Sequence, residues 1–318
     1  MGTLQYLLIF IGSLGLLILA SKYFTEAAER IGLSLKLSPF MVGVVIVAVG
    51  TSLPELVSGI IASTSGHPEI VLGNVLGANI SNIFLILGIT TLFAKKSIQL
   101  GKEYIFIDLH FMLGSATFLI YFLLDGVLSQ VEAIILLVGF VVYQVYLVRS
   151  EKPDEMPTLN EDKVVENLTE LSWKDIVIVL IAAAGIFFGA KFTVSSIQEL
   201  AIAMDVDKTI ISLTVLSLGT TLPELAVSIT AARKGHPEIA VGGILGSCIF
   251  NAFLVAGVSG AITDITLPKT ISNVSISFLL IAAIFFYLIS QDKKISKWEG
   301  MLFLLFYVVF VLKVSGVL

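Results

Sequence analysis

Ten apolar runs, separated by polar stretches, are the feature that most restricts what this chain can fold into. They cover approximately Leu4–Phe24, Pro39–Ala62, Glu69–Phe93, Tyr104–Leu124, Leu128–Val148, Lys174–Ile197, Ile210–Ala232, Glu238–Ile262, Thr270–Ile289 and Trp298–Lys313. A helix of about 20 apolar residues crosses the hydrocarbon core of a bilayer. Only 14% of the residues are charged and the mean hydropathy is +1.00, which excludes a water-soluble enzyme of this size. We therefore expect an all-α integral membrane protein with ten transmembrane helices.

The distribution of lysine and arginine predicts how these spans are oriented. If the chain starts outside, 15 of its 19 basic residues fall in the first, third, fifth, seventh and ninth connections. The positive-inside rule then places these connections in the cytoplasm and both termini outside. The longest polar stretch, 150–172, holds seven acidic residues, and we expect it to be a cytoplasmic linker between units 1–149 and 173–318. The compact chain favours a prokaryotic inner membrane.

The two predicted units repeat one another with an offset of 169 residues. GTSLPEL at 50–56 aligns with GTTLPEL at 219–225, GHPEI at 66–70 with the same letters at 235–239, and GNVLGANISN ending at Asn82 with GGILGSCIFN ending at Asn251. About half of the positions from Gly50 to Gly88 are identical in the second unit. Because each unit holds an odd number of spans, the two must enter the membrane from opposite faces. Inverted repeats are typical of secondary transporters, whose substrate site lies near the midplane between them.

One glutamate in each repeat, Glu55 and Glu224, lies in the middle of an apolar span. An ionised carboxylate at this depth is unfavourable unless it is paired or coordinated, so the pair predicts a functional site. The preceding residues, Pro54 and Pro223, have no amide hydrogen and leave the carbonyl oxygen four residues earlier without its helical donor. We therefore expect broken helices at the midplane, where free oxygens can bind cations. The alternative is a pair of protonated glutamates bonded to hydroxyl groups.

Other oxygen donors flank the glutamates in both repeats. The hydroxyl groups are those of Thr51, Ser52, Thr220 and Thr221, and the amide groups are those of Asn82 and Asn251. Carboxylate, hydroxyl, amide and carbonyl oxygens suit Ca²⁺ or Na⁺, and the set does not suit zinc or copper. Two glutamates neutralise one Ca²⁺, which sheds its water more easily than Mg²⁺ does. Helix capping by the hydroxyl groups and interhelical hydrogen bonding by the amides are the structural alternatives.

In these doubled motifs the chain resembles the paired alpha repeats of the sodium/calcium exchangers, within the cation/Ca²⁺ exchanger superfamily. The resemblance covers both halves, with the motifs at 43–88 and 212–257. It implies antiport of Ca²⁺ against Na⁺ by alternating access, in which the first and sixth spans slide across a core of the other eight. The cation ligands that it implies are Glu55, Glu224, Thr51, Ser52, Asn82, Asn251, Thr220, Thr221 and Ser247, with the backbone carbonyls of Ala48 and Ser217.

The chain departs from the family's pattern at two of these positions. Sodium-coupled members often have aspartate where this chain has Asn251, and serine where it has Ala78. The expected site therefore holds two negative charges, and three Na⁺ would leave one positive charge uncompensated. The motif GTSLPE nevertheless favours sodium, because the proton-coupled branch usually resembles GNxxE. Ca²⁺/H⁺ exchange is the first alternative, and a passive cation channel ranks below it.

Several other functions find no support in the sequence. It has no His–Glu zinc motif, no evident Ser/His or Cys/His pair and no paired intramembrane aspartates, so we expect neither an enzyme nor a cofactor. The net charge of −5 without a basic cluster argues against nucleic acid, which leaves ions and the lipid bilayer as partners. His67 and His236 belong to GHPE motifs that we expect to begin helices rather than to sense pH.

Overall fold

The computed structural model describes residues 3–35, 37–66, 68–100, 108–150, 172–203, 208–267 and 269–318. Within these ranges the side chains of 3, 148, 150, 194, 197, 198, 200–203, 208–220 and 269–273 are not described. Helices lie in all ten predicted spans, which confirms the all-α fold. Among the described residues, six helical segments are long and apolar enough, by length and composition, to cross a membrane. The predicted linker falls almost entirely, at 151–171, outside the described residues.

The helices follow one another in two sets with the same order. The first set is α1 (Thr3–Ser34), α2–η1–α3 (Pro39–Val42, Gly43–Val47 and Ala48–Thr64), α4–η2–α5 (Glu69–Ser81, Asn82–Ile86 and Leu87–Phe93), α6 (Leu109–Phe122) and α7 (Gln130–Ser150). The second set is α9 (Trp173–Ala203), α10 (Lys208–Lys234), α11–η5–α12 (Pro237–Ile249, Phe250–Val255 and Ala256–Ile262), α13 (Lys269–Ser290) and α14 (Lys297–Val314). The segments labelled η are π-helical turns: η1 lies in the second span, just before α3, while η2 and η5 interrupt the equivalent third and eighth spans at the same place.

Local sequence signals set several helix ends. The Ser38 hydroxyl accepts a hydrogen bond from the Met41 amide at the start of α2. Ser296 and Glu299 form a capping box at the start of α14. His236 is the N-cap of α11, with Pro237 at the first position, as the GHPE motif predicts. The equivalent His67 lies outside the described residues.

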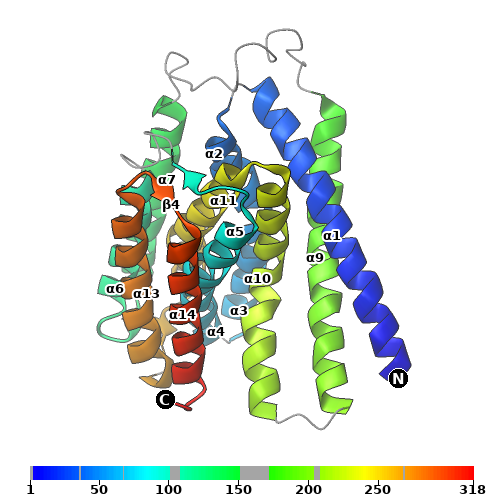
Figure 1. Cartoon of the computed structure of the whole chain (residues 1–318). Helices are drawn as coiled ribbons and strands as arrows, with labels where there is room; N and C mark the ends of the chain where they lie inside the picture. Colours follow the sequence, from blue (N-terminus) through cyan, green and yellow to red (C-terminus); the bar gives the residue numbers. More distant parts are fainter. Residues whose placement is uncertain are drawn as a thin grey trace.

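Short strands in the connections hold the two repeats together at both ends of the molecule. β1 (Ile98–Gln99), in the third connection, pairs with β4 (Lys294–Ile295), in the ninth. β2 (Val127–Leu128), in the fourth connection, pairs with β3 (Ile265–Thr266), in the eighth. Odd-numbered connections therefore meet odd-numbered ones, and even-numbered connections meet even-numbered ones, as inverted five-span repeats require. Both marked termini lie at the same end of the bundle, the lower one in Figure 1.

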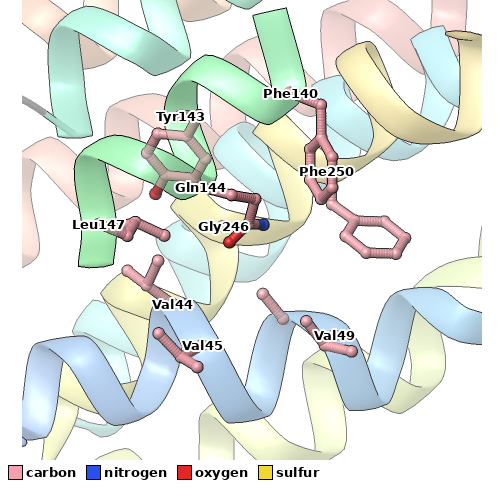
Figure 2. A pocket seen from close by; sticks show the side chains of 10 residues that line it. Val44, Val45, Val49, Phe140, Tyr143, Gln144, Leu147, Gly246 and Phe250 are labelled. Carbon is pink, nitrogen blue, oxygen red and sulfur yellow. The ribbon is translucent and has the colours of Figure 1, made fainter. Parts of the chain in front are cut away.

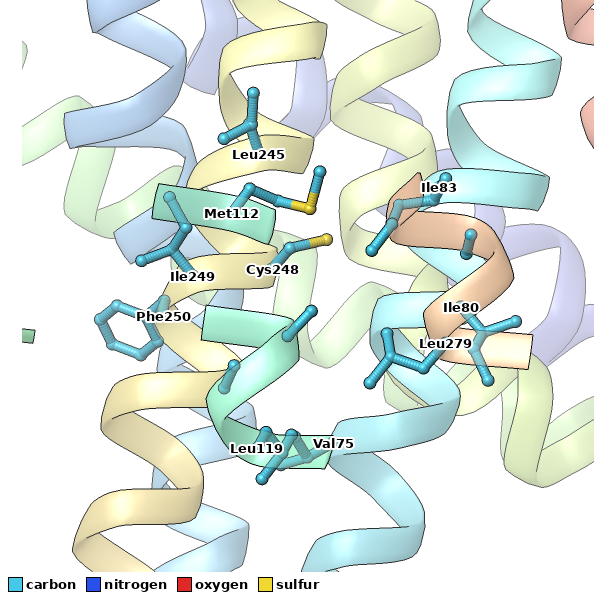
Figure 3. Packing of buried hydrophobic residues seen from close by; sticks show 14 of the residues in the cluster. Val75, Ile80, Ile83, Met112, Leu119, Leu245, Cys248, Ile249, Phe250 and Leu279 are labelled. Carbon is cyan, nitrogen blue, oxygen red and sulfur yellow. The ribbon is translucent and has the colours of Figure 1, made fainter. Parts of the chain in front are cut away.

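The helices form two groups. α1 and α9 pack along one another and stand to one side of the bundle (Figure 1). A Cβ atom added to Gly189 of α9 would lie 2.9 Å from the Leu17 backbone of α1, so the two helices touch directly. The other spans surround α4–η2 and α11–η5, and an apolar window of the Pro237–Ile262 span is 94% buried. Figure 3 shows this core, where Cys248 and Ile249 of α11 pack near Met112 of α6.

The glutamate-bearing helices are less interrupted than the sequence predicts. α3 and α10 continue through Pro54 and Pro223 as single helices. The expected break is therefore limited to one backbone hydrogen bond at each proline, while the neighbouring bonds keep the helix intact.

Irregular backbone lies instead at η1, before α3, and at the asparagines Asn82 and Asn251 of the repeated motifs. The Leu87 amide donates to the Asn82 carbonyl, and the Ala256 amide donates to the Asn251 carbonyl, each across five residues. Such π-helical turns occur frequently at functional sites. The sequence repeat is thus also a repeat of backbone geometry.

Candidate functional site

Glu55 of α3 and Glu224 of α10 are both buried, with 4% and 5% of their surface exposed. The two carboxylates are close enough to interact electrostatically, and the Thr51 side chain lies beside Glu224. One oxygen of each carboxylate, Oε2, has no hydrogen-bond partner among the described residues. Buried acceptors without a donor are rare because each loses its hydration without compensation. A bound cation would satisfy both oxygens.

Hydroxyl groups from the two repeats meet next to these carboxylates. The Ser52 hydroxyl of α3 donates to the Ser247 hydroxyl of α11 at an O–O distance of 3.0 Å. Thr51 donates to the Val47 carbonyl at 3.1 Å within its own helix. All of these side chains are buried. α3 also packs against η5, so the groups on α3 that could bind a cation lie close to the segment that carries Asn251.

The two motif asparagines are buried at the same crossing. Asn251 is 1% exposed, and its Nδ2 donates to Oδ1 of Asn79 at 3.2 Å. The Oδ1 atom of Asn251 has no partner among the described residues. Asn251 follows Ser247 by one helical turn, so both share one face of the helix. Asn82 is 2% exposed, and its side chain hydrogen-bonds to the Cys248 thiol.

Asn79 is a polar residue of this site that the sequence interpretation missed. It is 2% exposed, and its Nδ2 donates to the Cys248 carbonyl at 3.0 Å. Its signal in the sequence was a polar side chain three residues before Asn82, inside the repeated motif. That signal was weak because the repeat places a cysteine, not an asparagine, at the equivalent position.

Glycines allow the backbones of the two repeats to touch beside the carboxylates. A Cβ atom added to Gly246 of α11 would lie 2.6 Å from Cβ of Ala48 and 2.9 Å from the Val44 carbonyl oxygen. A Cβ atom on Gly43 would lie 2.6 Å from the Gly243 amide nitrogen. Neither position leaves room for a side chain. The Ala48 backbone is thereby held against the turn of α11 that carries Ser247.

A pocket adjoins this contact on the side of α7. Figure 2 shows Phe140, Tyr143, Gln144 and Leu147 of α7 facing residues of η1, α3 and α11. The pocket is also lined by Ala48 and Gly246, so it reaches the backbone beside the carboxylate pair. The Tyr143 hydroxyl donates to Asp108 at 3.0 Å, and both residues are buried. The pocket lining contains no carboxylate and therefore adds no charged ligand.

The structure locates nine of the eleven expected ligands. Glu55, Glu224, Thr51, Ser52, Asn82, Thr221, Asn251, Ser247 and Ala48 are all buried. Ser217 and Thr220 lie in the part of α10 whose side chains are outside the described residues. The described part of the chain contains no group of three or more histidine, cysteine, aspartate or glutamate residues that could hold a metal ion. The arrangement thus consists of two carboxylates and neutral oxygens.

Comparison with known proteins extends over almost the whole chain. The sequence profile of the family "sodium/calcium exchanger protein" matches residues 5–149 and 174–315. The chain is 31% identical to the sodium/calcium exchanger MaX1 of Methanosarcina acetivorans, over 98% of each protein. It is also 31% identical to an uncharacterised membrane protein of Methanocaldococcus jannaschii, over 93% of this chain and 94% of that one.

The fold agrees with the sequence comparison. A solved structure of the sodium-calcium exchanger NCX_Mj, soaked with zero Na⁺ and Ca²⁺, has a TM-score of 0.82 to this chain and 28% identity. The similarity covers 97% of this chain and 98% of that one. A second structure of NCX_Mj, soaked with 2.5 mM Na⁺ and 0.1 mM Ca²⁺, gives a TM-score of 0.80. Both halves of the chain, their order and their packing thus match one family, and the protein is a member of the sodium/calcium exchanger family.

Proposed function

We propose that this protein exchanges Na⁺ for Ca²⁺ across a membrane, at one cation site that contains Glu55 and Glu224. The observation that carries the proposal is a buried pair of carboxylates with unpartnered oxygens at the contact between two inverted repeats. Their combined charge of −2 neutralises one Ca²⁺ in a region of low dielectric constant. The names of the relatives MaX1 and NCX_Mj, both sodium/calcium exchangers, support this choice of ions.

The remaining ligands in this proposal are neutral oxygens from both repeats. They are the side chains of Thr51, Ser52, Asn82, Thr220, Thr221, Ser247 and Asn251, with the carbonyls of Ala48 and Ser217. Ca²⁺ takes six to eight oxygen ligands at roughly 2.3–2.6 Å, and these groups supply enough for one such ion. Exchange rather than leakage follows from the carboxylates, because an empty site with two negative charges is costly to carry through the apolar barrier.

Alternating access requires that one group of helices moves relative to another. α1 and α9 pack mainly on each other, and we propose that they form the moving group. The strand pairs β1–β4 and β2–β3 join the connections of the other spans and favour a rigid core. The proposal further places both termini outside and the linker 150–172 in the cytoplasm, between units 1–149 and 173–318. It places the protein in a prokaryotic plasma membrane and requires no enzymatic cofactor.

Isosteric removal of each carboxylate charge tests the site. Purified protein in liposomes loaded with Na⁺ should accumulate ⁴⁵Ca²⁺ from a Na⁺-free medium. Glu55→Gln and Glu224→Gln should each reduce this uptake to the background of empty liposomes, because one negative charge cannot neutralise Ca²⁺. Ser115→Ala is the matched control, since Ser115 is buried on α6 and donates only to the Met112 carbonyl of its own helix. Full uptake by both glutamine variants would exclude this site.

A further inference from the structure

We propose that Asn79 is a positioning residue, which determines that Asn251 presents its oxygen, and not its amide nitrogen, to the cation. The inference rests on the proposed function, because it concerns the same site. Asn79 lies on α4 of the first repeat and Asn251 on η5 of the second. Their side chains are joined by the hydrogen bond from Nδ2 of Asn251 to Oδ1 of Asn79.

The polarity of this bond follows from a third group, the Cys248 carbonyl. A carbonyl oxygen only accepts hydrogen bonds, so Asn79 must direct its Nδ2 toward it, at 3.0 Å. The Oδ1 atom of Asn79 then faces Asn251, which must donate its Nδ2 in return. Amide oxygen and nitrogen are assigned from their hydrogen-bond partners, and here a backbone group of fixed polarity decides the assignment for both side chains.

The free end of Asn251 is therefore its Oδ1 atom. This oxygen is buried and has no partner among the described residues, like Oε2 of Glu55 and of Glu224. If the amide turned over, its NH₂ group would face the site, and an NH₂ group donates hydrogen bonds and cannot bind a cation. Asn79 thus contributes to cation binding without contacting the cation.

The second repeat does not supply the same anchor to Asn82. The offset of 169 residues places Cys248 at the position equivalent to Asn79, and the Asn82 side chain hydrogen-bonds to its thiol. In Figure 3, the Cys248 side chain projects from α11 toward the neighbouring helix, on which Ile80 and Ile83 lie. A thiol is a weaker acceptor than an amide oxygen. The two asparagines are thus held by different partners, Asn251 by an amide oxygen and Asn82 by a thiol.

A double-mutant cycle on Na⁺-driven Ca²⁺ uptake tests the coupling between Asn79 and Asn251. Loss of one hydrogen bond changes an equilibrium constant by about tenfold at most. Asn79→Ala should therefore raise the apparent KM for Ca²⁺ by up to about tenfold, with a smaller effect on the maximal rate. In the Asn251→Ala background, Asn79→Ala should change KM less than twofold, because the amide that it positions is absent. Equal effects in both backgrounds would overturn the proposal.

A pair of substitutions at Asn79 keeps the test informative if the alanine variant folds poorly. Aspartate retains an acceptor oxygen for Nδ2 of Asn251 but loses the donor to the Cys248 carbonyl, whereas leucine has a similar volume and retains neither. Asn79→Asp should therefore raise KM less than Asn79→Leu, which should raise it as alanine does. Equal KM values for the two variants would contradict the positioning role, and Ser115→Ala serves again as the control.

The same experiment separates this inference from the proposed function. If wild-type protein takes up no Ca²⁺ against a Na⁺ gradient, the proposed function fails. The cycle is then measured as the Ca²⁺-dependent rise in melting temperature of the purified protein, where Asn79→Ala should reduce the rise only when Asn251 is present. If wild-type protein does transport Ca²⁺ and the two substitutions act independently, only the positioning role of Asn79 is refuted.

Discussion

Replacing Gly246 with alanine should impair the proposed cation site without removing any ligand. Gly246 lies on α11 immediately before Ser247, where the backbone of η1–α3 crosses α11. The new Cβ atom would lie 2.6 Å from Cβ of Ala48, whereas non-bonded carbon atoms prefer roughly 3.5–4.0 Å. The two segments must therefore separate by about 1 Å at this point.

A displacement of this size is large compared with the tolerance of a cation site. Ca²⁺–oxygen distances vary by only about 0.3 Å, so the Ala48 carbonyl would move out of range. Insertion of one carbon atom into a well-packed contact costs about 1–3 kcal/mol. If this strain falls on the cation-bound state, the apparent affinity for Ca²⁺ should drop by about 5- to 150-fold.

The assay is the KM of Na⁺-driven ⁴⁵Ca²⁺ uptake, with the elution profile of the detergent-solubilised protein as a check on folding. Gly114→Ala is the matched control, because it makes the same change within helix α6. Apart from its chain neighbours and the backbone of its own helix, no described atom lies within 4 Å of its new Cβ. Gly114→Ala should leave KM unchanged. A wild-type KM for Gly246→Ala would refute the close contact between the repeats at the site.

Three further predictions concern the proposed ligands and the ion pair between His236 and Glu29. Raising the pH from about 6 to about 8 should lower the melting temperature more in wild type than in His236→Gln. The interaction with Glu29, at 3.0 Å, raises the pKa of His236. The stabilisation by protonated His236 is therefore present below the ordinary histidine pKa of about 6.5 and disappears as the pH passes the raised pKa. Equal pH slopes would contradict this. Ca²⁺ at 100 times its Kd should raise the free energy of unfolding of wild type by about 2.7 kcal/mol and leave Glu55→Gln unaffected, as measured by chemical denaturation; an equal gain in the variant would count against Glu55 as a ligand. Asn251→Asp should make Ca²⁺ uptake depend more steeply on the Na⁺ concentration, because a third carboxylate can balance another cation. An unchanged Hill coefficient for Na⁺ would show that position 251 does not face the ions.

Much of the fold follows from features that are local in the sequence. Long apolar runs identify the ten spans because no other environment tolerates so little charge. The offset of 169 residues and the odd number of spans in each half predict the inverted repeats, which the paired connections of the structure confirm. Glu55 and Glu224 were identifiable for the same reason, since each interrupts an apolar run.

The parts that escaped prediction depend on contacts between helices far apart in the sequence. Asn79 matters because a helix 169 residues away places the Cys248 carbonyl 3.0 Å from its amide, and no periodicity within α4 encodes that distance. Pro54 and Pro223 predicted broken helices, yet α3 and α10 continue through them because each proline removes only one hydrogen bond. The π-helical turns at Asn82 and Asn251 carry no comparable sequence signal.

The central claim is that Na⁺ drives the movement of Ca²⁺ through this protein. The most direct test is ⁴⁵Ca²⁺ uptake into proteoliposomes of the purified wild-type protein, with an outward Na⁺ gradient in one set and an outward H⁺ gradient in another. Membership of the sodium/calcium exchanger family and the GTSLPE motif predict uptake with the Na⁺ gradient and none with the H⁺ gradient. Uptake with the H⁺ gradient alone would contradict sodium coupling and assign the glutamates to Ca²⁺/H⁺ exchange.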